Sequence, residues 1–185
     1  MTGCDWGGQP PAGGSGTTPG PALSPEATAS EQPQESLCLA ADLKAVAGWQ
    51  GAGGAMAGGV SFINKGAAPC ALEGRPGLHL IDANGALMPV ANLDYVEQPG
   101  DGATGSPTAD GGPVVLQPGG KAFVYFVWRN WCGQAPGPFK VAVALPGEGG
   151  QLVVPVQDPQ GAPVSSTPRC DDPGTASTIS VGQFR

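Results

Sequence analysis

One stretch near the middle of the chain, K-A-F-V-Y-F-V-W-R-N at residues 121–130, constrains the fold most strongly. Bulky apolar side chains occupy both the odd and the even positions from 123 to 128, so an extended chain here would be apolar on both faces. Such a strand belongs at the centre of a sheet, although a sandwich strand covered by a loop would show the same pattern. The sequence therefore predicts a sheet arranged around residues 121–130.

A second informative stretch covers residues 60–80, which read as a strand, an Asn-Lys-Gly turn, a cysteine, a second turn and another strand. The second turn is Gly74-Arg75-Pro76-Gly77, and glycine and proline are the residues that tight turns favour. Two extended segments and a candidate crosslink within so short a span predict the first corner of a β-sandwich.

Other short apolar runs follow at intervals typical of an all-β protein. Residues 39–49 fit both helical spacing and a strand, and we prefer a strand because a glycine-rich turn at 51–54 leads directly into the run at 56–63. Asn84-Gly85 indicates a hairpin between runs at 78–81 and 87–90, while residues 94–112 predict a long surface loop. With runs at 114–116, 139–145, 152–156 and 177–184, the chain predicts eight or nine strands in an all-β sandwich.

Five cysteines are present, at widely separated positions, and none forms a C-x-x-C pair. If residues 42–49 and 56–63 pair across their turn, Cys38 lies near Lys65 and within reach of Cys70, which favours a Cys38–Cys70 disulfide. Cys132 and Cys170 are then the remaining pair. Two disulfides would place the protein in an oxidising compartment; the alternative is four buried free thiols in a cytosolic protein.

Residues 1–36 form a separate segment rich in Gly, Pro, Ser and Thr, without Lys or Arg, and we expect it to be a disordered linker. Thr2-Gly3-Cys4 resembles the end of a bacterial lipobox, whose cysteine is acylated after signal cleavage. No apolar signal region precedes it here, so we expect a chain that begins near a mature terminus, with Cys4 as the lipid anchor. The alternative is an accidental cysteine in a disordered leader. Residues 37–185 are the expected folded domain.

Four motifs occur in order along the folded part: N-x-G-x-x-x-C-x-L-x-G-x-P-G-L from Asn64, L-x-P-G-G-x-A from Leu116, W-x-N-W-C-G from Trp128, and P-R-C-D-x-P-G from Pro168. Together they resemble a bacterial family catalogued as domain of unknown function four-two-three-two, over about residues 37–185. The resemblance implies a secreted protein or lipoprotein with an immunoglobulin-like β-sandwich. It implies no activity and no catalytic or binding residues.

Composition excludes several classes of function. The net charge is −7 and the eight basic residues are scattered, which argues against nucleic acid and against anionic lipid as partners. The single His79 lies on a predicted strand and cannot complete a zinc or blue-copper ligand set. No nucleotide-binding or nucleophile-elbow motif occurs, and the acids Asp171 and Asp172 are interpreted as solubilising loop charge. We therefore expect no catalytic residue, no metal and no cofactor.

Binding is the function class that remains. Trp131 and Tyr95 are the candidate contact residues, because exposed aromatic side chains anchor interfaces, although packing against the core or a disulfide is the interpretation that we favour for Trp131. We expect a monomeric, non-catalytic module on the outer face of a bacterial membrane, lipid-anchored or secreted, with a protein or cell-wall glycan as partner. The alternatives are an envelope glycan-acting enzyme that uses loop carboxylates and a purely structural envelope component.

Overall fold

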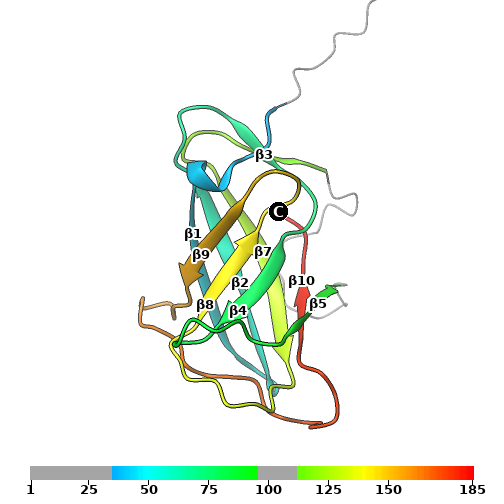
Figure 1. Ribbon diagram of the computed structural model, residues 1–185. Coiled ribbons are helices and arrows are strands. Elements are labelled where there is room, and N and C mark those ends of the chain that lie inside the picture. The colour runs from blue at the N-terminus through cyan, green and yellow to red at the C-terminus, as the bar shows by residue number, and fades with distance from the viewer. Residues whose placement is uncertain (1–34, 96–111) are drawn as a thin grey trace, which may run out of the picture. The chain divides into compact units, whose positions relative to one another are not determined.

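The computed structural model describes residues 35–95 and 112–185, and within them the protein is an all-β sandwich (Figure 1). A single 3₁₀ turn, Ala40–Asp42, precedes the first strand, and the described residues contain no α-helix. The strands are β1 (Leu43–Ala52), β2 (Ala55–Asn64), β3 (Cys70–Leu72), β4 (Gly77–Ile81), β5 (Ala91–Asp94), β6 (Val114–Leu116), β7 (Lys121–Arg129), β8 (Lys140–Ala144), β9 (Gln151–Pro155) and β10 (Thr178–Val181).

Five strands form the larger sheet in the order β1-β2-β7-β10-β5. Strand β7 lies at its centre and pairs antiparallel with both β2 and β10, as its two apolar faces predicted. Strands β1 and β2 form a hairpin closed by Gly53 and Gly54, both at positive φ, where a side chain would strain the backbone. The strand interpretation of residues 42–49 is therefore confirmed.

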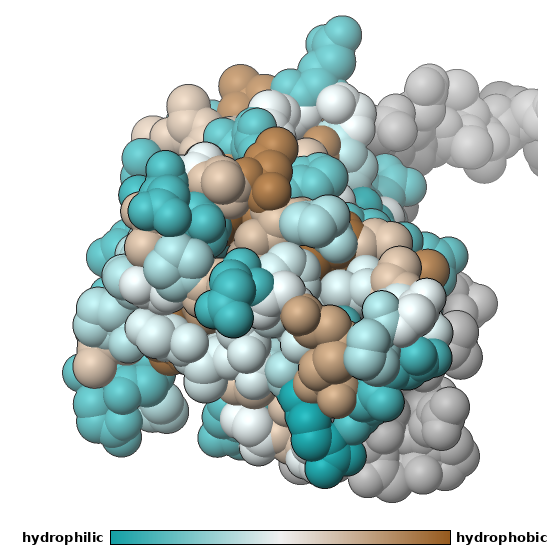
Figure 2. Space-filling model, turned by 60° about the horizontal axis from the view of Figure 1, so that its bottom comes forward, coloured by the Kyte–Doolittle hydropathy of each residue, from teal (hydrophilic) through white to brown (hydrophobic). Residues whose placement is uncertain are grey.

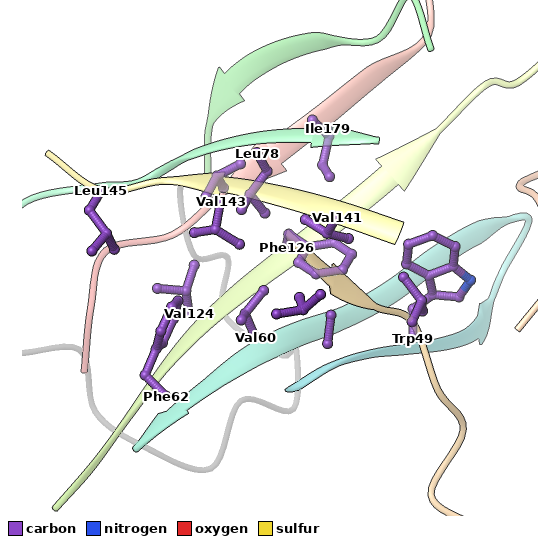
Figure 3. Packing of buried hydrophobic residues seen from close by; sticks show 14 of the residues in the cluster. Trp49, Val60, Phe62, Leu78, Val124, Phe126, Val141, Val143, Leu145 and Ile179 are labelled. Carbon is purple, nitrogen blue, oxygen red and sulfur yellow. The ribbon is translucent and has the colours of Figure 1, made fainter. Parts of the chain in front are cut away.

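Strands β4, β8 and β9 form a second, three-stranded sheet that packs across β1, β2 and β7 (Figure 1). The core lies between the two sheets and is filled from both sides (Figure 3). Val124 and Phe126 of β7 meet Val141 and Val143 of β8 there, and all four are fully buried. One end of the core is an aromatic cluster in which Trp49 packs 5.5–6.0 Å from its neighbours by ring centroids, namely Phe126, Trp128 and Phe139.

Asn64, at the end of β2, joins the larger sheet to the small β3-β6 sheet. Its side chain is buried, donates to the carbonyls of Ala68 and Leu116 at 2.9 Å each, and accepts the N–H of Gly66 at 2.9 Å. Its backbone exchanges hydrogen bonds with Gly119 and Gly120. The asparagine of the first motif and the Pro-Gly-Gly turn of the second are therefore parts of one hydrogen-bonded corner.

Both expected disulfides are present: Cys38–Cys70 and Cys132–Cys170. Lys65 donates its N–H to the Asp42 carbonyl, which continues the β1-β2 pairing and brings Cys38 beside Cys70 as the register argument required. Disulfides of this kind are typical of proteins from oxidising compartments.

The structure differs from the sequence-based expectation in two places. The Asn84-Gly85 turn forms, but the returning segment makes only a single bridge from Ile81 to Leu87; the chain then crosses to the other sheet as β5, parallel to β10. Strand β3 was not predicted, because a three-residue strand carries too little periodicity to recognise. Residues 1–34 and 96–111, which include Cys4 and most of the predicted long loop, lie outside the described residues.

The two disulfides should differ in accessibility, because Cys38 and Cys70 are buried whereas Cys132 and Cys170 are both exposed. They close segments of similar length, with sequence separations of 32 and 38, so loop entropy alone predicts about 4 kcal/mol for each. We expect mild reductant under native conditions to open Cys132–Cys170 first, measured by alkylation and peptide mass spectrometry. Replacing Cys38 and Cys70 by alanine should lower the free energy of unfolding by about 1 kcal/mol more than the same change at the other pair, because it also leaves a cavity. Simultaneous reduction of both bonds would contradict this expectation.

Candidate binding groove

The outer face of the larger sheet, turned away from the core, carries a row of small residues beside aromatic ones. The strand register aligns Gly48 of β1 with Gly59 of β2 and Tyr125 of β7. One step along, it aligns Val46, Ser61 and Phe123. Because glycine has no side chain, β1 and β2 form a low floor next to the ridge made by β7.

Phe123 leans over this floor. A Cβ atom added at Gly59 would lie 2.1 Å from Cζ of Phe123 and 2.5 Å from the carbonyl oxygen of Val124, so no larger residue fits there without displacement. The glycine is required by the close approach of the ring, since its φ is not in the left-handed region. The floor and the ridge therefore depend on each other.

The far wall comes from the segment after β9. Gln157 donates its N–H to the carbonyl of Ala47 at 2.9 Å, which holds the segment along the edge of β1. Asp158 then accepts the N–H groups of Gln160 and Ala162 at 2.9 and 2.8 Å, fixing the turn that follows. The floor, the ridge and this wall enclose an open groove of about 610 Å³, within the range of small-ligand sites.

The groove combines apolar and neutral polar groups. Its apolar surface comes from Val46, Ala57 and the two aromatic side chains, and its polar groups come mainly from Gln50, Ser61 and Gln157. Asp158 is the only residue with a charged side chain among the described residues that line it. A ligand with an apolar face and several hydroxyl or amide groups would match this lining better than a highly charged one.

Arg185 supports the ridge from behind. Its backbone exchanges two hydrogen bonds with Phe123, at 2.9 and 3.1 Å, and its guanidinium lies 5.3 Å from the ring centroid of Phe123 and 6.0 Å from that of Tyr125. Both contacts are within cation–π range. The Phe123 ring therefore packs over Gly59, and the Arg185 guanidinium contacts the rings of both Phe123 and Tyr125.

The two aromatic residues singled out from the sequence lie on opposite faces of β7. Tyr95 is half-buried and packs edge-on against Tyr125 at 5.0 Å, next to the ridge on the outer face. Trp131 is half-buried against the core residue Trp128 at 5.8 Å, and its indole nitrogen is buried. The geometry thus favours packing for Trp131 and proximity to the groove for Tyr95. Cys4 lies outside the described residues.

The acidic residues considered for catalysis are engaged in loop structure. Asp171 pairs with Arg169, and Asp172 accepts from the Thr175 hydroxyl and the Gly174 N–H. These two hydrogen bonds, the hydroxyl's first, hold the pKa of the Asp172 carboxyl below its usual value, which is the opposite of what a general acid needs. His79 is exposed on β4, and within residues 35–95 and 112–185 no cluster of metal-ligating side chains occurs.

The loop end of the sandwich has less exposed apolar surface that could form a binding site. The face that Figure 2 brings forward is mostly hydrophilic, with hydrophobic colour in small, separate patches. Large exposed apolar patches mark interaction sites, so this end is a weaker candidate than the outer face of the larger sheet.

The residues that form the groove are visible in the sequence, but only the strand register shows that they lie together. Strand alternation places Phe123 and Tyr125 on one face, and residues 51–59 are rich in glycine, but a glycine run alone indicates only flexibility or a turn. Which glycine lies beside which aromatic ring depends on the pairing of three strands.

Comparisons with known proteins give one match. The family model described as Domain of unknown function (DUF4232) matches residues 38–185. Neither the curated proteins nor the solved structures contain a match to the chain. Among the described residues no helix is long and apolar enough to cross a membrane.

Asn130 should prove to be the organiser of the acidic loop. It adopts φ 56°, donates to the carbonyls of Asp172 and Thr175 at 2.9 and 2.8 Å, and accepts the N–H groups of Asp171 and Asp172 at 3.0 and 2.9 Å. We expect Asn130→Ala to lower the free energy of unfolding by about 2 kcal/mol, through lost hydrogen bonds and backbone strain. Asn130→Gly should cost less, because glycine tolerates this φ. Urea denaturation measures both; an equal cost for the two variants would show that backbone strain contributes nothing here.

Proposed function

The chain belongs to the DUF4232 family, whose description states no activity. We propose from its own surface that it is a non-catalytic binding module of the bacterial cell envelope. In this proposal the groove beside Phe123 and Tyr125 binds cell-wall glycan. The single observation that carries this proposal is the groove itself, an aromatic ridge over a glycine floor with amide and hydroxyl groups along it.

Glycan chemistry fits this lining. A sugar ring presents an apolar face of C–H groups, which packs on aromatic side chains, and a rim of hydroxyl groups, which pair with amides and hydroxyls such as those of Gln50 and Ser61. The rigidity of the ridge supports binding as well, because a side chain already held in place loses little entropy when a ligand contacts it.

The arrangement of the acids supports a non-catalytic role. Glycoside hydrolysis needs two carboxyl groups flanking the scissile bond, one of them with a raised pKa. Asp158 and Asp172 instead accept hydrogen bonds within their own turns, and the pKa of Asp172 is lowered. A glycosidase would instead need a carboxyl group with a raised pKa beside a second carboxyl group.

The proposed location is the outer face of the bacterial membrane. The two disulfides support an oxidising compartment, and Thr2-Gly3-Cys4 supports lipidation of Cys4. In this proposal the membrane is reached only through the lipid, the module acts as a monomer, and it needs no cofactor.

We expect Phe123→Ala and Tyr125→Ala each to weaken binding of soluble cell-wall glycan strands at least tenfold, because each removes part of the ridge. Ser61→Trp should weaken it similarly by filling the groove. Isothermal titration calorimetry with the purified chain measures all three effects, after a glycan array has selected the tightest-binding fragment.

Two control variants separate the groove from the rest of the surface. Leu87→Ala removes an exposed apolar side chain that does not line the groove, and Trp131→Phe keeps the packing against Trp128. Both should bind within twofold of the unchanged chain. Glycan binding that survives Ser61→Trp, or no glycan binding on the array, would reject the groove as a glycan site. If the unchanged chain captures a defined envelope protein and Phe123→Ala does not, the groove is assigned to a protein partner instead.

The anchor has its own test. Intact-mass analysis of the native protein extracted from membranes should give a mass increased by acyl chains on Cys4 and decreased by four hydrogen atoms for the two disulfides. Cys4→Ser should move the protein from the membrane fraction to the soluble fraction. A native protein that lacks acyl mass would reject the lipid anchor while leaving the groove proposal standing.

A further inference from the structure

The far wall of the groove lies close against β1 because residue 48 is glycine. A Cβ atom added at Gly48 would lie 2.7 Å from the carbonyl oxygen of Gln157, so a larger residue would displace the segment after β9. The Gln157 N–H donates to the Ala47 carbonyl at 2.9 Å, and an antiparallel bridge pairs Gln157 with Pro163. Asp158, the next residue, is therefore held on a fixed support beside the groove.

Asp158 closes a five-residue turn with one of its two carboxylate oxygens. Its Oδ1 atom accepts the N–H groups of Gln160 and Ala162, and its backbone bonds to Gly161 and Ala162 at 2.9 Å each. Within the part of the chain that the structure describes, no hydrogen bond reaches the Oδ2 atom of this half-buried residue. One oxygen therefore builds the turn, and the other remains available to a ligand in the groove that Asp158 lines.

No neighbouring cation balances the charge of this carboxylate. The ion pairs among residues 35–95 and 112–185 are Arg75–Asp94 and Arg169–Asp171, and none of the described residues that line the groove is Lys, Arg or His. The lining thus carries one unpaired negative charge beside neutral amides, a hydroxyl and aromatic rings. Electrostatic complementarity favours a ligand that brings one positive charge to this wall and disfavours a ligand that brings a second negative charge.

We propose that Asp158 is the specificity-determining residue of the groove and that it selects glycans with free amino groups. This inference rests on the glycan-binding proposal and names the ligand class of that same site. A protonated sugar amine has three N–H donors and a charge opposite to that of the carboxylate, whereas an N-acetyl group offers one neutral amide N–H. The sugar ring packs on Phe123 and Tyr125, and its ammonium group pairs with Oδ2 of Asp158.

The chain contains a matched control for this carboxylate. Asp82 forms the same kind of turn: its Oδ1 atom accepts the N–H groups of Asn84 and Ala86 at 2.9 Å each, and its backbone bonds to Gly85 and Ala86. Asp82 is half-buried like Asp158, but it does not line the groove. Asparagine at either position keeps an oxygen for the two N–H groups, so Asp82→Asn and Asp158→Asn remove the same charge from the same kind of turn.

The probes are two linear tetramers of glucosamine, one with free amines and one fully N-acetylated. Each is titrated into the full chain by isothermal titration calorimetry, in mildly acidic buffer that keeps the amines protonated. The unchanged chain should bind the free-amine tetramer at least fivefold more tightly. In Asp158→Asn the two affinities should agree within twofold, whereas Asp82→Asn should keep the fivefold preference. Raising the salt concentration from about 0.05 to about 0.5 M should reduce the preference at least twofold, because salt screens an ion pair in an open groove.

Two outcomes would overturn this inference and leave the groove proposal standing: equal affinity of the unchanged chain for the two tetramers, or a preference that survives in Asp158→Asn. A preference lost equally in Asp82→Asn would also overturn it, because the effect would then follow the overall charge of the chain. If neither tetramer binds, amino sugars are rejected as the ligand class, and the glycan array decides separately whether the groove binds any other glycan. Urea denaturation of both variants checks that each remains folded.

Discussion

The alternation of side chains along β7 is the constraint on which the rest of the structure depends. Hydrogen bonds on both edges, to β2 and β10, fix this strand at the centre of the larger sheet. Its even-numbered residues, Val124, Phe126 and Trp128, are fully buried in the core. Its odd-numbered residues, Phe123 and Tyr125, are consequently directed to the outer face, where they form the ridge of the groove. A shift of one residue in register would exchange the two sets and remove both the core and the groove.

The groove illustrates how glycine can shape a sheet surface. Glycine weakens a strand interior, yet β1 and β2 carry Gly48, Gly58 and Gly59 side by side. At Gly59 the ring of Phe123 occupies the space that a side chain would take, so the sheet regains apolar contact through the aromatic neighbour. This is the physical link between sheet stability and the binding surface that we propose.

Backbone hydrogen bonds join the edge strands β1 and β9 of the two sheets at both ends. The Gln157 N–H donates to the Ala47 carbonyl at one end, and the Ala40 N–H donates to the Gly149 carbonyl at 2.7 Å at the other. Proteins usually protect open edges with charge or proline, and both Lys44 and Pro155 occur here.

The sequence by itself determined the class of the protein. Period-two alternation, turn residues and cysteine spacing are local or nearly local signals, and they were sufficient for the sandwich, for the central position of residues 121–130 and for both disulfides. The resemblance carried by the four motifs agreed with the family match over residues 38–185. The tertiary structure alone decided the path after Ile81, where a predicted hairpin became a crossing to β5, because the choice of partner strand depends on distant residues of β10. It alone also decided which aromatic side chains lie beside glycine, since this depends on the register of strands far apart in the chain and no local pattern encodes that register.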